Sequence, residues 1–189
     1  MNFRIGICGC AGCGKSSLAE AVALKLSIPN LKSRAITEDI LRRDGYDYSS
    51  GIQIERFLAN TGRQNEILRR TIEQQQVKDF VTDRTVVDLA AYAVCEMHHS
   101  DVAALRRIMD TCRKQVSVYT HLVLCPWRDI PVAETQKRTL NPWYQFMIHA
   151  LERGILDDWG CKYQILKSED REDRLQEIMV ELVGQTTRQ

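Results

Sequence analysis

The 189-residue sequence has no apolar run close to the roughly 20 residues that a helix needs to cross a bilayer, and no signal-peptide pattern at its start. It also has almost no net charge, because 26 lysines and arginines are offset by 25 aspartates and glutamates. A balanced charge argues against a large basic surface for non-specific nucleic-acid binding, although a local basic cleft stays open. These absences predict a cytoplasmic protein without a membrane segment.

The seven cysteines lack the spacing of a disulfide framework, which favours a reducing compartment. Cys8, Cys10 and Cys13 lie close together, as in a metal or redox cluster. No Cys/His pair with ligand spacing follows them, which counts against structural metal. Oxidation of Cys13, next to a helix N-terminus that lowers the pKa of thiols, stays open.

The residues from Gly9 to Ser16 fill every fixed position of the phosphate-loop pattern G-x-x-x-x-G-K-[ST]. A strand is expected before this loop, at 3–8, and a helix after it, at 17–26. The glycines let successive backbone N–H groups point at a phosphate, and the helix N-terminus adds a positive dipole. Lys15 is then expected at the β- and γ-phosphates and Ser16 on Mg²⁺. The predicted nucleotide-binding residues are Gly9, Gly12, Cys13, Gly14, Lys15, Ser16 and Ser17.

Short apolar segments alternate with helical segments along the rest of the chain, as in βαβ units. Further strands are expected at 34–37, 80–83, 121–125 and 163–166. Helices are expected at 54–78 with an interruption near 60–62, and at 86–97, 102–116 and 142–156, with a last one capped by Ser168 and running to 183. The pattern predicts a single α/β domain over 1–189, with three layers and a five-stranded parallel sheet flanked by helices.

Asp83 follows the apolar residues 80–82, which places a carboxylate at the carboxyl edge of the sheet beside the phosphate loop. There it can hold Mg²⁺ or serve the acceptor, and Arg84 is suited to a phosphate or acceptor contact. The alternative is that Asp83 caps the following helix. Asp88, one helical turn further on, either supports the site or is exposed.

Glu38 and Asp39 follow the predicted strand at 34–37, so at least one carboxylate is expected to face the same cleft. Phosphoryl transfer to an alcohol benefits from a base that accepts the hydroxyl proton. We interpret Glu38 as that base, with Asp39 as the other candidate. A helix cap at this point is the alternative reading.

Two groups of basic residues complete the candidate site. The loop at about 127–141 carries Arg128, Lys137 and Arg138 and suits a lid that closes on the phosphoryl group, although a solvated loop is the alternative. An acceptor region at about 38–78 interleaves aromatics with arginines, as a phosphorylated, ring-bearing acceptor would require. Nearby acids nearly balance these arginines, so an ordinary charged helix face stays open. The arginines of this acceptor region are Arg42, Arg43, Arg56, Arg63, Arg69 and Arg70.

The order of these motifs resembles the P-loop kinases related to nicotinamide riboside kinase domains, and also small phage-encoded kinases, including those that phosphorylate 5-hydroxymethyluracil in DNA. The resemblance covers nearly the whole chain. Its more specific part is the pattern D-R-x-x-x-D-x-x-x-Y from Asp83 to Tyr92, followed by Arg138 before Asn141-Pro142. The resemblance implies ATP as donor, Mg²⁺ as cofactor and catalytic roles for Lys15, Glu38, Asp83, Arg84 and Arg138. Ser16 and Asp83 are the expected metal ligands.

The expected activity is transfer of the γ-phosphate to a hydroxyl of a nucleoside- or nucleotide-type acceptor, with 5-hydroxymethyluracil in phage DNA as the leading specific case. A kinase of free nucleosides, nucleoside monophosphates or nicotinamide riboside is the alternative. A second alternative is a non-catalytic nucleotide-dependent switch or ATPase module. The chain lacks the N-K-x-D motif of GTPases, and Asp83 has no second acid after it, as a remodelling ATPase usually would. A homodimer stays open.

Overall fold

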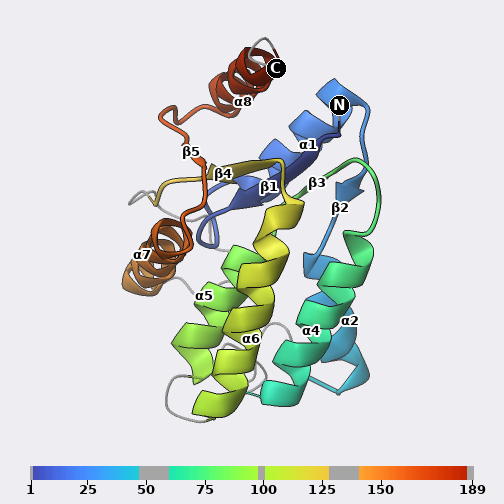
Figure 1. Ribbon diagram of the computed structural model, residues 1–189, viewed down its shortest axis with the longest axis vertical. Helices are drawn as coiled ribbons and strands as arrows, with labels where there is room; N and C mark the ends of the chain where they lie inside the picture. The colour runs from blue at the N-terminus through green and yellow to red at the C-terminus, as the bar shows by residue number, and fades with distance from the viewer. Residues whose placement is uncertain (1, 47–59, 98–100, 128–140, 187–189) are drawn as a thin grey trace.

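The computed structural model describes residues 2–46, 60–97, 101–127 and 141–186. Five parallel strands form one sheet in the order β2-β3-β1-β4-β5 (Figure 1). The central strand β1 pairs with β3 through Ile5 and Val81 and with β4 through Ile5 and His121. The strands are β1 (Arg4–Cys8), β2 (Asn30–Leu31), β3 (Phe80–Thr82), β4 (His121–Leu124) and β5 (Gln164–Ile165).

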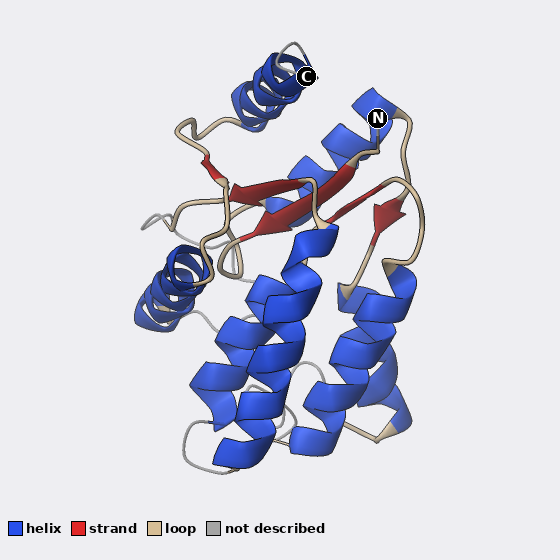
Figure 2. Ribbon diagram, viewed as in Figure 1, coloured by secondary structure: helices blue, strands red, loops and turns tan. Residues whose placement is uncertain are grey.

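Helices cover both faces of this sheet (Figure 2). Alternate strand residues point to opposite faces, so Ile5 and Ile7 pack under α1 (Lys15–Leu26) and α8 (Arg171–Thr186). The other face packs against the larger group of helices through residues such as Phe80 and Leu124. That group contains α2 (Arg34–Arg43), α4 (Thr61–Gln74), α5 (Val86–Met97), α6 (Val102–Gln115) and α7 (Pro142–Asp158), and a short 3-10 turn, η1 (Val116–Val118), leads into β4. The predicted three-layer α/β fold with a five-stranded parallel sheet is confirmed.

Gly6 in the central strand allows the start of α5 to lie close to the sheet. A Cβ at this position would lie 2.8 Å from Cγ2 of Thr85 and 2.9 Å from Cδ1 of Tyr119. The Tyr119 hydroxyl accepts a hydrogen bond from the backbone N–H of Val86 (3.1 Å) and donates one to Gln75 (3.1 Å). These contacts fix the first turn of α5 beside the end of β1, where the phosphate loop begins.

Two predicted elements differ in the structure. Residues 34–37 form the first turn of α2 and not a strand, because Ile36, Ile40 and Leu41 have helical spacing and bury one face of α2. The strand at this point of the sheet is β2, which lies just before α2. Ser168 does not cap the last helix. The Asp170 side chain does, since it accepts from the backbone N–H groups of Glu172 (2.7 Å) and Asp173 (3.3 Å).

The remaining expected helices lie close to their predicted positions. The helix expected at 54–78 begins at Thr61, behind the cap Asn60, whose side chain accepts from the backbone N–H of Arg63. Its predicted first part, 54–59, lies outside the described residues. Within the part of the chain that the structure describes, none of the helices combines the length and the apolar character that a membrane crossing demands.

Candidate active site

The phosphate loop has the backbone conformation that its glycines predict. Gly9, Gly12 and Gly14 have φ angles of 142°, 89° and 90°, in the range that residues with a side chain rarely adopt. At Gly9 a Cβ would also lie 2.8 Å from the carbonyl oxygen of Cys125. Helix α1 starts at Lys15, directly after Gly14, so its free N–H groups line the loop.

Lys15 is half-buried, and its ammonium group lies inside the loop. It donates hydrogen bonds to the backbone carbonyls of Gly9 and Cys10, and the distance to Cys10 is 2.8 Å. Its Nζ is 4.0 Å from a carboxylate oxygen of Asp88. Burial alone would lower the pKa of Lys15, but the negative charges of Cys13 and Asp88 outweigh it and the pKa is raised. Lys15 is therefore a permanent cation at the place where phosphate would bind.

Ser16 and Asp83 meet at the carboxyl edge of the sheet, as the sequence predicts. The Ser16 hydroxyl donates to Oδ2 of Asp83 at 2.5 Å. The other oxygen, Oδ1, is buried and has no hydrogen-bond partner among the described residues. A hydroxyl beside a carboxylate with a spare oxygen is a donor set of the kind that Mg²⁺ prefers. These two residues therefore fit the metal that the sequence implies.

The alternative reading of Asp83 as a helix cap is wrong, because Thr85 caps α5. The Thr85 hydroxyl accepts from the backbone N–H groups of Val87 (3.1 Å) and Asp88 (3.3 Å). Asp88 in turn accepts from the backbone N–H and the hydroxyl of Thr85, both at 2.7 Å. This reciprocal pair is a capping box. The Asp83 carboxylate is therefore not used as a cap and contacts Ser16 instead. Asp88 is buried, and it supports the site by fixing the start of α5.

The structure places Arg84 and Glu38 on neighbouring elements. Arg84 donates to the hydroxyl of Thr37 at 3.0 Å and lies over the ring of Tyr92, 5.5 Å from its centroid. Glu38 is the next residue after Thr37, but it stands in helix α2 and not after a strand, and it pairs with Arg34 at 2.8 Å. Neither Glu38 nor Asp39 caps a helix. The role of Glu38 as a base stays a prediction.

A buried glutamate that the sequence did not single out interacts electrostatically with Lys15. Glu152 of α7 is fully buried, and among the described residues no donor reaches either of its carboxylate oxygens. The negative charge of Asp88 also acts on this carboxyl and disfavours a second negative charge there. Burial, with the charge of Asp88 added, raises the pKa of Glu152 well above its ordinary value. The raised pKa favours the protonated, neutral form of Glu152.

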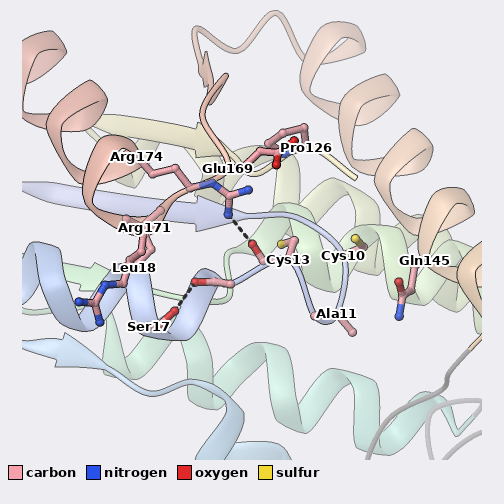
Figure 3. A pocket seen from close by; sticks show the side chains of 12 residues that line it. Cys10, Ala11, Cys13, Ser17, Leu18, Pro126, Gln145, Glu169, Arg171 and Arg174 are labelled. Atoms are coloured by element: carbon pink, nitrogen blue, oxygen red, sulfur yellow. Dashed lines mark hydrogen bonds between the residues drawn. The ribbon is translucent and has the colours of Figure 1, made fainter. Parts of the chain in front are cut away.

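A second missed residue, Arg174 of α8, connects the last helix to the phosphate loop. It is buried, and it donates to the carbonyl oxygen of Cys13 at 2.7 Å (Figure 3). It also donates to the carbonyl oxygen of Ser168 at 2.8 Å. The pocket drawn in Figure 3 has the phosphate loop on one side and the start of α8 on the other, with Gln145 of α7 at its end. Its lining residues are Cys10, Ala11, Gly12, Cys13, Gly14, Ser17, Leu18, Pro126, Gln145, Glu169, Arg171 and Arg174.

The predicted lid residues Arg128, Lys137 and Arg138 lie outside the described residues, as do Arg56, Tyr48 and Phe57 of the acceptor region. The other arginines of that region are largely paired with acids. Arg43 contacts Glu66 at 2.8 Å, and Arg63 contacts Asp44 at 2.7 Å. Arg69 and Arg70 pair with Glu73 and Asp39. The alternative of a charge-balanced helix face thus describes these residues better than a phosphate-binding surface does.

The cysteine cluster does not form a metal site in the part of the chain that the structure covers. Within residues 2–46, 60–97, 101–127 and 141–186, no group of three or more Cys, His, Asp or Glu side chains is arranged to hold a metal ion. All seven cysteines are free thiols.

A family model described as an AAA domain matches residues 4–174. The chain belongs to this family. No curated protein matches the sequence. Among solved structures, deoxyadenosine kinase from M. mycoides with bound dCTP is similar, with a TM-score of 0.68 and 14% identity over 95% of this chain and 98% of that one.

Two further structures share the fold. The NadR protein in complex with NR gives a TM-score of 0.67 at 15% identity over 94% of this chain, which spans 49% of the NadR chain. Shikimate kinase from Bacteroides thetaiotaomicron gives 0.56 at 14% identity over 96% of this chain and 99% of that one. The predicted P-loop kinase fold of this AAA-domain chain is confirmed. Because the structures named for kinases act on different acceptors, the fold alone leaves the acceptor open.

Proposed function

We propose that the chain is an ATP- and Mg²⁺-dependent kinase that transfers the γ-phosphoryl group to a hydroxyl of a small nucleoside- or nucleotide-type acceptor. The observation that carries this proposal is the group formed by Lys15, Ser16 and Asp83. A permanent cation, a hydroxyl and a carboxylate with a spare oxygen meet at the mouth of a phosphate loop. Phosphoryl transfer depends on positioning and charge neutralisation, and these groups supply both.

Each residue has a defined part in this proposal. The loop N–H groups and Lys15 bind the donor phosphates, while Ser16 and Asp83 hold Mg²⁺, which neutralises charge on the β- and γ-phosphates when it is bound. Arg84, which contacts Thr37 and Tyr92, is proposed to bind a phosphate group or the acceptor. Glu38, which follows the Arg84 partner Thr37, is the proposed base, and Asp39 is the other candidate; both are paired with arginines, Glu38 with Arg34 and Asp39 with Arg70. Arg138 is the proposed lid arginine.

The similar structures support a small acceptor. Two of the three are named for kinases, and the deoxyadenosine kinase is covered along 98% of its length. The pairing of Arg43, Arg63 and Arg70 with acids leaves these side chains little capacity for DNA phosphates. A free nucleoside is therefore the preferred acceptor, and 5-hydroxymethyluracil in DNA is an outcome for the test to decide. We also propose that the protein acts in the cytoplasm. We make no proposal about a homodimer.

The test follows label from [γ-³²P]ATP with Mg²⁺. The acceptor panel contains deoxynucleosides, ribonucleosides, nucleoside monophosphates, nicotinamide riboside and hydroxymethylated DNA. Label on a nucleoside is the expected result. If DNA is labelled, and the rate of labelling falls steeply as the salt concentration rises, the acceptor is DNA and not a free nucleoside. Label released only as free phosphate would contradict a kinase and favour an ATPase or switch module.

Matched variants on helix α1 control this experiment. Lys15→Ala removes the loop cation, and Lys25→Ala removes an exposed lysine at the other end of the same helix. Transfer is expected to disappear in the first variant and to persist in the second. Equal transfer by both variants would show that the phosphate loop is not the donor site.

A further inference from the structure

The phosphate loop brings together cysteines that the proposed function does not use. Cys10 and Cys13 stand in the loop, and Cys125 directly follows β4 beside it, with its backbone N–H bonded to the carbonyl of Cys8 at 2.9 Å. A Cβ on Gly9 would lie 3.0 Å from the Cys13 sulfur and 3.0 Å from Cβ of Cys125, so these two side chains meet over Gly9. Cys10 and Cys125 are also the residues that affect the pKa of Cys13 most strongly.

The charges around Cys13 favour its thiolate form. The Lys15 ammonium lies 4.0 Å from the sulfur, and the N-terminus of α1 begins only two residues further on. His149 and Glu152 of α7 interact electrostatically with this sulfur, and the raised pKa of Glu152 disfavours a negative charge on that side chain. Interaction with the neighbouring thiols of Cys10 and Cys125 lowers the pKa of Cys13, burial opposes this effect, and the charge of Lys15 lowers the pKa further.

Cys13 is also the accessible member of this cluster. Cys8 and Cys125 are fully buried and Cys10 is 2% exposed, whereas Cys13 is half-buried and lines the pocket of Figure 3. Burial raises the pKa of Cys8, whereas the pKa values of Cys10 and Cys125 are raised first by interaction with Cys13 and then by burial. A reagent entering the pocket therefore finds a single activated sulfur.

We propose that Cys13 is a nucleophilic modification site inside the phosphate loop, which reacts with alkylating agents and with low-molecular-weight disulfides. With a disulfide RS–SR, the Cys13 thiolate attacks one sulfur, a new S–S bond joins Cys13 to that RS group, and the other RS leaves as a thiolate with the electron pair. The neighbouring thiols stay protonated, so the mixed disulfide persists. Because the sulfur lines the loop pocket, modification and nucleotide binding exclude each other. This last part rests on the proposed function.

Cysteines elsewhere in the chain serve as internal controls. Cys95 and Cys161 are half-buried like Cys13, but burial raises the pKa of Cys161, and it raises that of Cys95 to about 11. The folded chain is treated with iodoacetamide at pH 7, and peptide mass spectrometry follows each cysteine over time. Cys13 is expected to react about tenfold faster than Cys161 or more, since only the thiolate reacts. Cys13→Ser should remove the fast phase, and Cys161→Ser should retain it.

Protection by Mg²⁺ with ATP is measured in the same reaction, and ATP binding is measured separately by calorimetry. Slower alkylation of Cys13 in the presence of nucleotide supports both the reactive site and the nucleotide pocket. Equal rates at Cys13 and Cys161 in a chain that binds ATP would overturn the inference and leave the proposed function standing. Fast alkylation without ATP binding or protection would support the reactive thiol and contradict the proposed donor site.

Discussion

The buried Glu152 yields a stability prediction whose sign can be worked out from the structure. Its pKa in the folded chain is raised, first by burial and then by Asp88, whereas in the unfolded chain it titrates near 4.5. Between these two pKa values the folded state binds the extra proton. Stability is then fully present below the unfolded pKa and decreases as pH rises toward the folded pKa, by about 1.4 kcal/mol for each pH unit.

Glu152→Gln removes this dependence, because the amide does not titrate, while it keeps the size and shape of the buried side chain. The variant is expected to gain stability over the wild-type chain as pH increases, with the same slope of about 1.4 kcal/mol per pH unit inside that window. Asp88, whose pKa burial also raises, is present in both chains, so its contribution largely cancels in the difference.

Urea unfolding at a series of pH values from 5 to 8 measures this difference. Glu20→Gln, at an exposed glutamate of α1, is the matched control and should follow the wild-type curve. A variant that is less stable than wild type by the same amount at every pH would refute the reasoning. Such a result would mean that Glu152 is ionised in the folded chain and serves as a counter-ion of Lys15.

The other predictions concern the phosphate loop and its contacts. Lys15→Ala is expected to lower transfer from labelled ATP by at least about 100-fold with an unchanged circular dichroism spectrum, because the loop cation is lost while the core is untouched. Asp83→Asn should weaken the Mg²⁺ dependence of the rate strongly, and a titration with Mg²⁺ measures this. Glu38→Gln should lower turnover with little change in the dissociation constant for ATP, since a base acts on the acceptor; a change in ATP affinity alone would move the base role to Asp39. Arg174→Ala should destabilise the chain by about 1.5–3 kcal/mol for each charge-assisted hydrogen bond that is lost, as urea unfolding would show.

The parts of the fold that the sequence predicts well have strong local signals. Helix α5 carries a continuous apolar sequence, and α7 begins with Asn141 and Pro142, which favour a helix start. The loop glycines fix the backbone where Lys15 and Ser16 stand. The prediction at 34–37 was wrong because two β-branched residues resembled a strand, while the helical spacing of the following isoleucine and leucine decides the structure.

The parts of the candidate site that the sequence could not predict depend on contacts between distant elements. Glu152 has the same pattern as an exposed glutamate of an amphipathic helix, and only the packing of α7 against α5 places it beside Asp88. Arg174 likewise looks like an exposed residue of the last helix. Strand β2 has two residues, which is too few to show an alternating pattern. Each of these features is set by tertiary packing, which overrides local preference.

The bond between Arg174 and the carbonyl of Cys13 has a consequence for the biosynthesis of this protein. The two residues are 161 positions apart in the chain, so the phosphate loop leaves the ribosome well before its partner does. At the usual rates of translation this gap corresponds to roughly 8–30 s. During that time the loop has its full sequence but not the contact that holds its backbone. The nucleotide pocket therefore reaches its final form only when helix α8 has emerged, and a nascent chain is not expected to bind ATP before then.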